Sequence, residues 1–439
     1  MYLLYDALLL LYVLFRLPSV AWAAWRHGKA LGDLGQRCGR LPRAVNPERR
    51  PSIWVHAVSV GETLAARPLL AALREAYPGH RRLLSTTTAT GQQVARGLGD
   101  LVDATFYAPF DLPPFVARAL DRAAPDLLIV VDTEIWPNLL RACRRRGVRT
   151  ALANGRLTAR SFRGYRRAGR FMRRVVGDFD RICVQTEQWG RWFEALGADP
   201  ARVSVTGSLK FDAPSVAAAE GAPRHPVLAC LPPPGTRPVV VAASTLRGEE
   251  EPVLRAFARA RERHPHALLV MAPRHPERFG EAARIAAAAG YRVARRTSLA
   301  EGGTREADVV VLDTIGELPY VYEAASCVFV GGSLVPAGGH NILEPAAVGK
   351  AILFGPHMES FAEIAHRFVA RDAAVQVRSA DDLESQVTAL LDDRERRRRL
   401  GAAARAVIDT YRGATSRTLA AVAELLPPGA SAGACVAGS

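Results

Sequence analysis

Short apolar stretches alternate with segments of helical periodicity twice along this chain of 439 residues, and this repeat restricts the fold more than any other feature. The first series runs from Ser52 to about Gly207, and the second runs from Val239 to the last apolar helix. Strands that alternate with helices form parallel sheets covered on both faces. With 49% apolar residues, the chain is also too long for one compact core. We therefore expect two Rossmann-like α/β domains.

The domain boundaries follow from where the periodicity stops. We expect a first domain at residues 31–212, a linker at 213–237 that is rich in Ala, Pro and Gly, a second domain at 238–427, and a disordered tail at 428–439. In such sheets ligands bind at the carboxyl ends of the strands. We therefore expect the substrates there, in a cleft that the two domains share.

The expected elements can be given by residue range. In the first domain the strands are Ile53–Val58, Leu83–Thr87, Leu127–Asp132, Thr150–Ala153, Ile182–Gln185 and Val203–Thr206, with helices such as Ala65–Tyr77 and Pro137–Arg145 between them. In the second they are Val239–Ala243, Ala267–Met271, Val309–Leu312, Cys327–Val330 and Ala351–Phe354, with helices at Pro252–Arg263, Arg396–Tyr411 and Thr418–Leu426.

The amino terminus is apolar. Residues Ala7 to Phe15 carry no polar side chain except the Tyr12 hydroxyl, Arg16 interrupts the run, and Pro18 to Trp25 is largely apolar again. Roughly 20 apolar residues are needed to span a bilayer, so a short anchor and an interfacial helix remain alternatives, and a cleaved signal peptide is a third. Basic residues follow the run, which favours a cytoplasmic body. We expect residues 1–30 to associate with a membrane.

The formal charge of +15 would attract nucleic acid, an anionic membrane or a phosphorylated substrate. We disfavour nucleic acid, because no recognised nucleic-acid-binding motif is present and aromatic residues are few. The six cysteines form no C-x-x-C pair, so no disulfide framework or zinc site is indicated. Asp178-Phe179-Asp180 imitates a metal-binding D-x-D motif but lies before a strand, away from the expected nucleotide site, and we predict no metal and no cofactor.

Acidic residues follow two strands of the first domain. Glu62 lies where a strand passes through a turn containing Ser59 into a helix, and a carboxylate there could accept a proton. A helix cap is the alternative for Glu62. Asp132 follows another strand and could orient a sugar or a catalytic group, or it could cap the next helix.

Basic residues follow the next strands of the same domain. Arg156 and Arg160 belong to a basic segment that suits a phosphorylated acceptor, although a solvated positive face would look the same. Lys210 stands out because Lys29 and Lys350 are the only other lysines. Its compact ammonium differs chemically from the planar guanidinium that this chain otherwise uses. Retention on the surface by chance is the alternative.

In the second domain, polar and glycine-rich turns follow the strands. Pro273-Arg274 follows one strand, and an arginine beside a helix start suits a phosphate. The stretch Gly338-Gly339-His340-Asn341-Ile342-Leu343-Glu344 is the sharper signal. Its paired glycines could let the backbone approach a ligand, and Glu344 could bind a ribose diol. Simple capping by Asn341 is the alternative.

Seven strings resemble, in order and spacing, the 3-deoxy-D-manno-octulosonic acid (Kdo) transferase family over nearly the whole chain. They are H-A-V-S-V-G-E, D-T-E-I-W-P-N, A-N-G-R-L-T-A-R-S, V-T-G-S-L-K-F-D, P-R-H-P-E-R-F, D-T-I-G-E-L and V-G-G-S-L-V-P-A-G-G-H-N-I-L-E. The resemblance implies the GT-B architecture and an inverting transfer of Kdo from CMP-Kdo to the lipid A precursor, in lipopolysaccharide core biosynthesis. It also implies a location at the cytoplasmic face of the inner membrane.

Position by position, the resemblance implies roles for individual residues. Glu62 matches the general base, while Asp132 and Lys210 match positions that stabilise the transition state. Ser59, Arg156 and Arg160 are weaker candidates for acceptor binding. The implied CMP contacts are Pro273, Arg274, Ile315, Gly316, Glu317, Asn341, Ile342, Leu343 and Glu344.

The chain departs from the family pattern at two places. Asp132 stands where the family usually has Glu, and Leu246-Arg247 stands where it often has His-Glu. A GT-B relative that uses another nucleotide sugar, such as a GlcNAc transferase or a UDP-sugar epimerase, is the rival enzyme.

Overall fold

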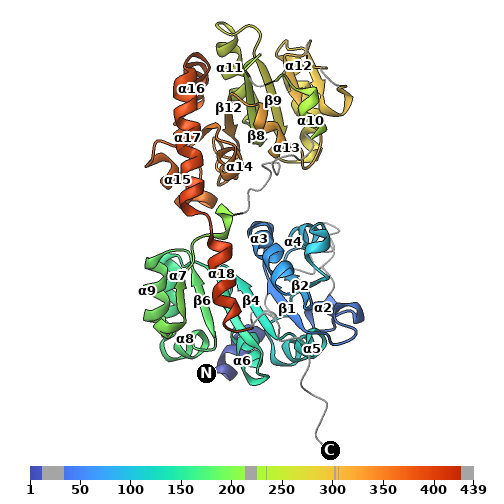
Figure 1. The fold of residues 1–439 in the computed structure, drawn as a ribbon, viewed down its shortest axis with the longest axis vertical. Helices are drawn as coiled ribbons and strands as arrows, with labels where there is room; N and C mark the ends of the chain where they lie inside the picture. Colours follow the sequence, from blue (N-terminus) through green and yellow to red (C-terminus); the bar gives the residue numbers. More distant parts are fainter. Residues whose placement is uncertain (12–33, 213–224, 234, 301–302, 305, 427–439) are drawn as a thin grey trace, which may run out of the picture. The chain divides into compact units, whose positions relative to one another are not determined.

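The computed structural model describes residues 1–11, 34–212, 225–233, 235–300, 303–304, 306 and 307–426. The chain divides into two compact units (Figure 1). The first comprises Met1–Ala213 together with Arg412–Ser439, and the second comprises Pro214–Tyr411.

The first unit is built on a parallel sheet of seven strands in the order β3-β2-β1-β4-β5-β6-β7. Because alternate residues of a strand face opposite sides, Trp54 of β1 packs in one buried cluster while Ile53 packs in another on the other face. The strands are β1 (Ser52–His56), β2 (Arg81–Thr86), β3 (Ala104–Tyr107), β4 (Leu127–Val131), β5 (Arg149–Gly155), β6 (Arg181–Val184) and β7 (Val203–Val205).

Helices cover this sheet, and a short 3₁₀ helix, η4 (Leu209–Phe211), follows its last strand. The helices are α2 (Leu34–Arg37), α3 (Val60–Ala76), α4 (Ala89–Arg96), α5 (Pro113–Ala123), α6 (Pro137–Arg145), α7 (Ala159–Arg167), α8 (Gly169–Val176), α9 (Glu187–Leu196) and α18 (Ala414–Ala423).

The second unit is also built on a seven-stranded parallel sheet, in the order β10-β11-β9-β8-β12-β13-β14. Its strands are β8 (Val239–Thr245), β9 (Leu268–Pro273), β10 (Val293–Arg295), β11 (Val309–Val311), β12 (Cys327–Val330), β13 (Ala351–Phe354) and β14 (Val375–Gln376). Its helices are α10 (Pro226–Cys230), α11 (Glu250–Arg261), α12 (Phe279–Ala288), α13 (Leu318–Val321), α14 (Leu343–Ala347), α15 (Ala362–Val369), α16 (Ala380–Asp392) and α17 (Arg394–Tyr411).

Two parallel α/β sheets are therefore confirmed, and each expected strand has a counterpart. The structure adds three short strands that the sequence pattern did not indicate: β3, β10 and β14. Each lies at the end of its sheet.

The end of the chain differs from our expectation. We placed residues up to 427 in the second domain, but α18 packs on α3 and β6 of the first unit. Its buried residues Ala414 and Val422 belong to the same apolar cluster as Ile53. The Arg417 guanidinium also donates to the Thr206 carbonyl oxygen at 2.8 Å. The helix belongs to the first unit because that unit buries its apolar side.

The remaining boundary predictions lie partly outside the described residues. Residues 2–11 are helical, whereas most of the expected membrane segment, from residue 12, lies outside that part of the chain. Among the helices that the structure describes, none is long and apolar enough to cross a membrane. The expected linker contains α10, with residues 213–224 outside the described set, and the predicted tail at 428–439 lies outside it as well.

Candidate active-site residues of the two units

Glu62 lies in the first turn of α3, directly after β1. Its Oε2 accepts a hydrogen bond from the Val58 amide at 2.6 Å, and its Oε1 accepts one from the Ser59 hydroxyl at 3.0 Å. Burial raises the pKa of Glu62, the two hydrogen bonds oppose that rise, and the nearby charges of Asp132 and Glu134 add to it. The carboxylate thus forms the capping contacts that we considered as an alternative, and it is also a stronger base than an exposed glutamate.

Asp132 follows β4 and is held by residues from the neighbouring strand β5. Its Oδ1 accepts from the Asn154 amide at 2.6 Å, and its Oδ2 accepts from the Arg156 guanidinium at 3.2 Å. Asp132 and Asn154 both have a positive φ, 65° and 58°. Asp and Asn adopt this backbone conformation more readily than other non-glycine residues. Their shared conformation turns the two side chains toward each other at the carboxyl ends of adjacent strands.

Asn154 also connects this cluster to Lys210. Its Oδ1 accepts from the Leu209 amide at 3.0 Å, and Leu209 begins the 3₁₀ helix η4 that contains Lys210. One buried side chain therefore supports both Asp132 and the segment that bears Lys210. Sequence analysis included Asn154 only within the string A-N-G-R-L-T-A-R-S and gave it no role of its own. Its position at the end of an apolar strand was the signal that could have identified it.

Two further polar residues lie beside this cluster. His56, the last residue of β1, is fully buried, and burial lowers its pKa to about 4, so the ring is neutral near pH 7. Its ring packs edge-on against Trp136, with centroids 5.0 Å apart. The Trp136 indole donates to Glu134 Oε2 at 3.0 Å, and burial raises the pKa of Glu134. Glu62, Asp132 and Glu134 thus form an acidic group, in which Glu134 is held by Trp136.

The three weaker acceptor-binding candidates occupy different environments. The Ser59 hydroxyl is hydrogen-bonded to Glu62, and Arg156 is paired with Asp132. Arg160 lies exposed in the first turn of α7. Ser59 and Arg156 therefore belong to the acidic cluster, whereas Arg160 lies on the solvated face that we considered as the alternative.

In the second unit, Glu344 and Arg274 form the centre of the expected nucleotide site. The Asn341 amide donates to Glu344 Oε1 at 3.1 Å, while Asn341 Oδ1 accepts from the Leu343 amide at 3.0 Å. The Asn341 side chain therefore binds the first amide of α14 and also fixes Glu344. Burial raises the pKa of Glu344, and the Asn341 hydrogen bond and the Arg274 charge oppose that rise. Arg274 is exposed, directly after β9.

Among the other expected nucleotide contacts, some residues are exposed to solvent and others are buried. Ile315 is 83% exposed, and Gly316 has a φ of +89° with open space where a Cβ would lie. By contrast, the side chains of Pro273, Ile342 and Leu343 are buried. A ligand could reach these three only through their backbone.

Glu317 already has protein partners. Its carboxylate is paired with the Arg296 guanidinium through two contacts, at 3.0 and 3.1 Å, and it accepts a hydrogen bond from Thr314. These contacts hold the turn that bears Ile315 and Gly316. The Glu317 side chain therefore fixes the shape of this turn.

The structure gives a packing reason for the paired glycines, and the approach of a ligand to their backbone stays a prediction. A Cβ at Gly338 would lie 2.5 Å from the Ser360 hydroxyl, and one at Gly339 would lie 2.3 Å from the Met358 sulfur. Both residues also have a positive φ. Glycine is needed here so that the loop can pack against residues 358–360.

A second buried carboxylate, which sequence analysis did not single out, organises the neighbouring glycine turn. Glu249 is fully buried, and its oxygens accept from the backbone amides of Leu246, Gly332, Ser333 and Leu334 at 2.7 to 3.0 Å. It thereby joins the turn after β8 to the turn after β12. No pattern in the sequence separates it from the adjacent Glu250.

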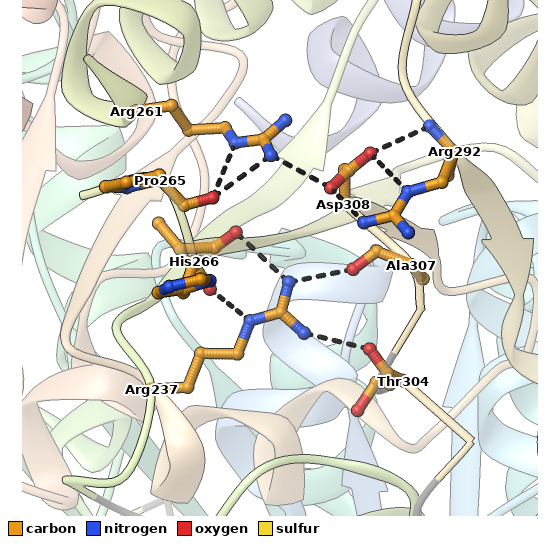
Figure 2. A network of polar contacts seen from close by, with 9 residues as sticks. Arg237, Arg261, Pro265, His266, Arg292, Thr304, Ala307 and Asp308 are labelled. Atoms are coloured by element: carbon orange, nitrogen blue, oxygen red, sulfur yellow. Dashed lines mark hydrogen bonds and ion pairs between the residues drawn. The ribbon is translucent and has the colours of Figure 1, made fainter. Parts of the chain in front are cut away.

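A pocket of about 640 Å³ lies at the edge of this sheet where β8, β9 and β11 begin. Figure 2 shows the polar contacts among residues at this edge. The Arg237 guanidinium donates to four backbone carbonyl oxygens, those of Thr304 and Ala307 at 2.8 Å, Ala267 at 3.2 Å, and His266. Asp308 is paired with Arg261 and Arg292, each at 3.0 Å. These contacts join neighbouring loops. They leave few free hydrogen-bond donors or acceptors for a ligand.

Both aspartates of the segment that resembles a D-x-D motif form hydrogen bonds within the first unit. Asp178 accepts from Arg144 at 3.1 Å, and Asp180 accepts from the Thr150 amide at 2.8 Å. In the described part of the chain, no group of three or more His, Cys, Asp or Glu side chains is arranged to hold a metal ion. The absence of a bound metal or cofactor remains a prediction.

Comparisons with known proteins show which family the chain resembles. Residues 32–213 match the family model described as 3-deoxy-D-manno-octulosonic-acid transferase (kdotransferase), and residues 231–407 match glycosyl transferases group 1. The chain is 38% identical to the 3-deoxy-D-manno-octulosonic acid transferase of Bordetella pertussis, over 93% of this chain and 96% of that one. It is 35% identical to the transferase of the same name from Haemophilus influenzae, over 90% and 91%.

Solved structures show a similar fold at low sequence identity. UDP-GlcNAc 2-epimerase from Neisseria meningitidis is 12% identical and has a TM-score of 0.57, over 85% of this chain and 100% of that one. This likeness shows the fold alone, because epimerases and transferases share such scaffolds. The activity class follows from the sequence relatives: this chain is a glycosyltransferase that belongs to the 3-deoxy-D-manno-octulosonic acid (Kdo) transferase family.

Proposed function

We propose that the enzyme transfers Kdo from CMP-Kdo to the lipid A precursor, with inversion at the anomeric carbon, as a step of lipopolysaccharide core biosynthesis. We place the reaction at the cytoplasmic face of the inner membrane, with the anionic lipid surface as a partner and without nucleic acid. Family membership supports the Kdo transfer. The separate acidic and nucleotide-type clusters of the two units support a division into acceptor chemistry and donor binding.

The observation that carries this proposal is the environment of Glu62. A sugar hydroxyl is a poor nucleophile, so a positioned carboxylate has to accept its proton as the new bond forms. Glu62 lies at the carboxyl end of a parallel strand, and burial raises its pKa. In the proposed step the acceptor oxygen bonds to the anomeric carbon, its proton passes to Glu62, and the bond to the CMP phosphate oxygen breaks. CMP leaves with the electron pair.

The second unit would hold the donor. We assign Glu344 to the ribose diol and Arg274 to the phosphate, because the carboxylate is fixed by Asn341 and the guanidinium lies beside it. Asp132 and Lys210 would stabilise charge in the transition state. The cationic side chains of Arg274 and Lys210 and the backbone amides can oppose the charge on departing CMP, so we propose no metal ion.

Mass spectrometry of the lipid product tests the proposal directly. The purified full chain, CMP-Kdo and the lipid A precursor should give a product heavier by one or more Kdo residues. Glu62→Gln should lower transfer by roughly 100-fold or more, the usual scale for loss of a general base, and should leave calorimetric CMP binding intact. Glu75→Gln, an exposed position on the same helix, is the matched control and should retain wild-type activity.

Two results would contradict the proposal. Transfer from a UDP-sugar but not from CMP-Kdo would assign a different donor. Near wild-type transfer by Glu62→Gln would leave Glu62 as a helix cap, and the base would then have to be sought at Asp132 or Glu134.

A further inference from the structure

Five arginines converge on one hollow in the first unit. The hollow has a volume of about 500 Å³ and lies between the carboxyl ends of α6 and α8. Arg141, Arg144 and Arg145 of α6 line it together with Arg173 and Arg174 of α8. Asp178 is the one acidic residue in the lining, so five positive charges face one negative charge. We call this hollow the arginine pocket.

Part of this charge is explained by the fold itself. Cations near helix carboxyl ends are stabilised by the helix dipole. Arg144 is also held by Asp178 at 3.1 Å and by the Gly177 carbonyl oxygen at 2.9 Å, and Arg141 lies over the Tyr2 ring, 4.1 Å from its centroid. The dipole explains a basic residue at each helix end, but it does not explain why two helix ends direct their arginines into one hollow.

The other three arginines of the pocket are exposed to solvent. Within the part of the chain that the structure describes, the side chains of Arg145, Arg173 and Arg174 make no hydrogen bond or ion pair. Clustered like charges repel each other. A ligand with several anionic oxygens would relieve this repulsion, and guanidinium groups suit phosphate oxygens in particular.

An apolar surface adjoins the pocket. The helix at residues 2–11 packs on the first unit through Tyr2 and Tyr5, whose rings contact Phe171. The Tyr2 hydroxyl donates to Asp178 Oδ2 at 3.2 Å, which fixes the helix to the wall of the arginine pocket. Leucines elsewhere on the helix are 58 to 84% exposed; they are Leu3, Leu4, Leu8 and Leu11. Exposed leucines beside clustered arginines are typical of a surface that lies on an anionic membrane.

The arginine pocket is separate from the proposed reaction site. It adjoins the end of α6, which precedes β5, and the end of α8, which precedes β6. Both strands begin at that edge of the sheet, whereas Glu62 and Asp132 follow the ends of β1 and β4 at the opposite edge. A phosphate in the pocket would therefore hold the enzyme in place rather than take part in transfer.

We propose that the arginine pocket binds the phosphate of an anionic phospholipid headgroup while the exposed leucines of residues 2–11 enter the apolar layer. We favour a lipid over free phosphate because the positively charged pocket lies beside an exposed apolar face. The inference rests on the membrane location that we proposed above, but it does not depend on the identity of the donor or the acceptor.

Vesicle binding by the full chain tests the proposal. The measured quantity is the ratio of partition coefficients onto phosphatidylcholine vesicles with and without phosphatidylglycerol, which cancels the apolar contribution of the amino terminus. The wild type should prefer the vesicles that contain phosphatidylglycerol. Arg173→Gln/Arg174→Gln should reduce that preference by about 30-fold, because each basic side chain near an anionic surface contributes a factor of about 5.

Two matched variants separate this site from bulk charge and from the apolar contacts. Arg394→Gln/Arg399→Gln removes the same charge from exposed positions on α17 and should leave the preference unchanged. Leu4→Ser/Leu8→Ser should weaken binding to both kinds of vesicle and preserve their ratio. Arg173→Gln/Arg174→Gln should also transfer Kdo to a detergent-dispersed acceptor at the wild-type rate.

Each alternative result has a distinct meaning. Equal preference in the wild type and Arg173→Gln/Arg174→Gln would overturn the arginine pocket but leave the membrane location standing. A wild type without any preference would overturn the pocket and weaken the proposed location. Calorimetric binding of inorganic phosphate that Arg173→Gln/Arg174→Gln abolishes, with an unchanged vesicle preference, would identify a soluble phosphate ligand and would also overturn the proposal.

Discussion

Replacing Asn154 by alanine tests whether the acidic cluster of the first unit acts in catalysis. The Asn154 side chain is buried, and it donates to Asp132 at 2.6 Å and accepts from the Leu209 amide at 3.0 Å. Alanine removes both contacts together. Asp132 then keeps only Arg156, and the turn that carries Lys210 loses its anchor to β5.

The expected loss of stability follows from these contacts. Each buried polar group left without a partner costs about 1 to 3 kcal/mol, and two such groups result from the change. Alanine would also have to adopt the φ of 58° at this position, which costs about 1 to 2 kcal/mol for a residue other than Gly, Asn or Asp. Because such contributions are not additive, we expect a decrease of about 3 to 5 kcal/mol in the free energy of unfolding.

The assay combines denaturant unfolding with the transfer rate on a detergent-dispersed acceptor. Asn154→Ala should lower both the unfolding free energy and kcat, the latter by about tenfold or more, since misplacing a positioned group by about 1 Å has effects of this order. Asn138→Ala is the matched control. Asn138 is also buried, and its amide donates to Asp6 and to the Asp111 carbonyl oxygen, both at 2.6 Å. It should lose stability but retain kcat.

The comparison of Asn154→Ala with Asn138→Ala shows whether the contact between Asp132 and Asn154 acts in catalysis. If Asn154→Ala is destabilised like Asn138→Ala and still transfers at the wild-type rate while folded, the Asp132–Asn154 contact is structural only. Asp132 and Lys210 would then need no fixed relation for catalysis, and the assignment of a transition-state role to them would fail.

Three further predictions concern single groups. Glu344→Ala should weaken CMP binding by about 1 to 3 kcal/mol in calorimetry, and wild-type affinity would remove Glu344 from the nucleotide site. Lys210→Ala should lower kcat with little change in KM, whereas a raised KM at full kcat would assign Lys210 to ground-state binding. Because burial raises the pKa of Glu62, its proton-accepting carboxylate form is lost at a higher pH on acidification. The acidic limb of kcat/KM should therefore lie above pH 4.5, and a limb at or below that value would exclude Glu62 as the base.

Most strands that sequence analysis identified share one physical property, and the partly exposed edge strand β7 is an exception. Central strands such as β1 and β4 are buried on both faces, so they appear as continuous apolar runs. The strands it did not identify, β3, β10 and β14, have one neighbour each and are two to four residues long. Edge strands bury less surface and do not need such runs. Their pairing depends on the adjacent strand, which local sequence does not reveal.

In the candidate site, too, some features follow from local sequence and others depend on distant residues. The sequence by itself determined which residue types follow the strands, because turns after parallel strands come to one edge of the sheet. It thereby identified Glu62, Asp132, Arg274 and Glu344. The contacts among them depend on distant residues. Asn154 meets Leu209 across 55 positions of the chain, and Glu249 meets Gly332 across 83.

Tertiary structure alone decided two questions that local pattern leaves open. The last helix, α18, belongs to the first unit because β6 and α3 bury its apolar side. Gly338 and Gly339 are glycines because Ser360 and Met358 occupy the space that a Cβ would need. Sequence determines local conformation and the alternation of buried and exposed residues, because these depend on neighbours along the chain. Packing partners and their steric demands come from residues far apart in the sequence, so only the folded structure specifies them.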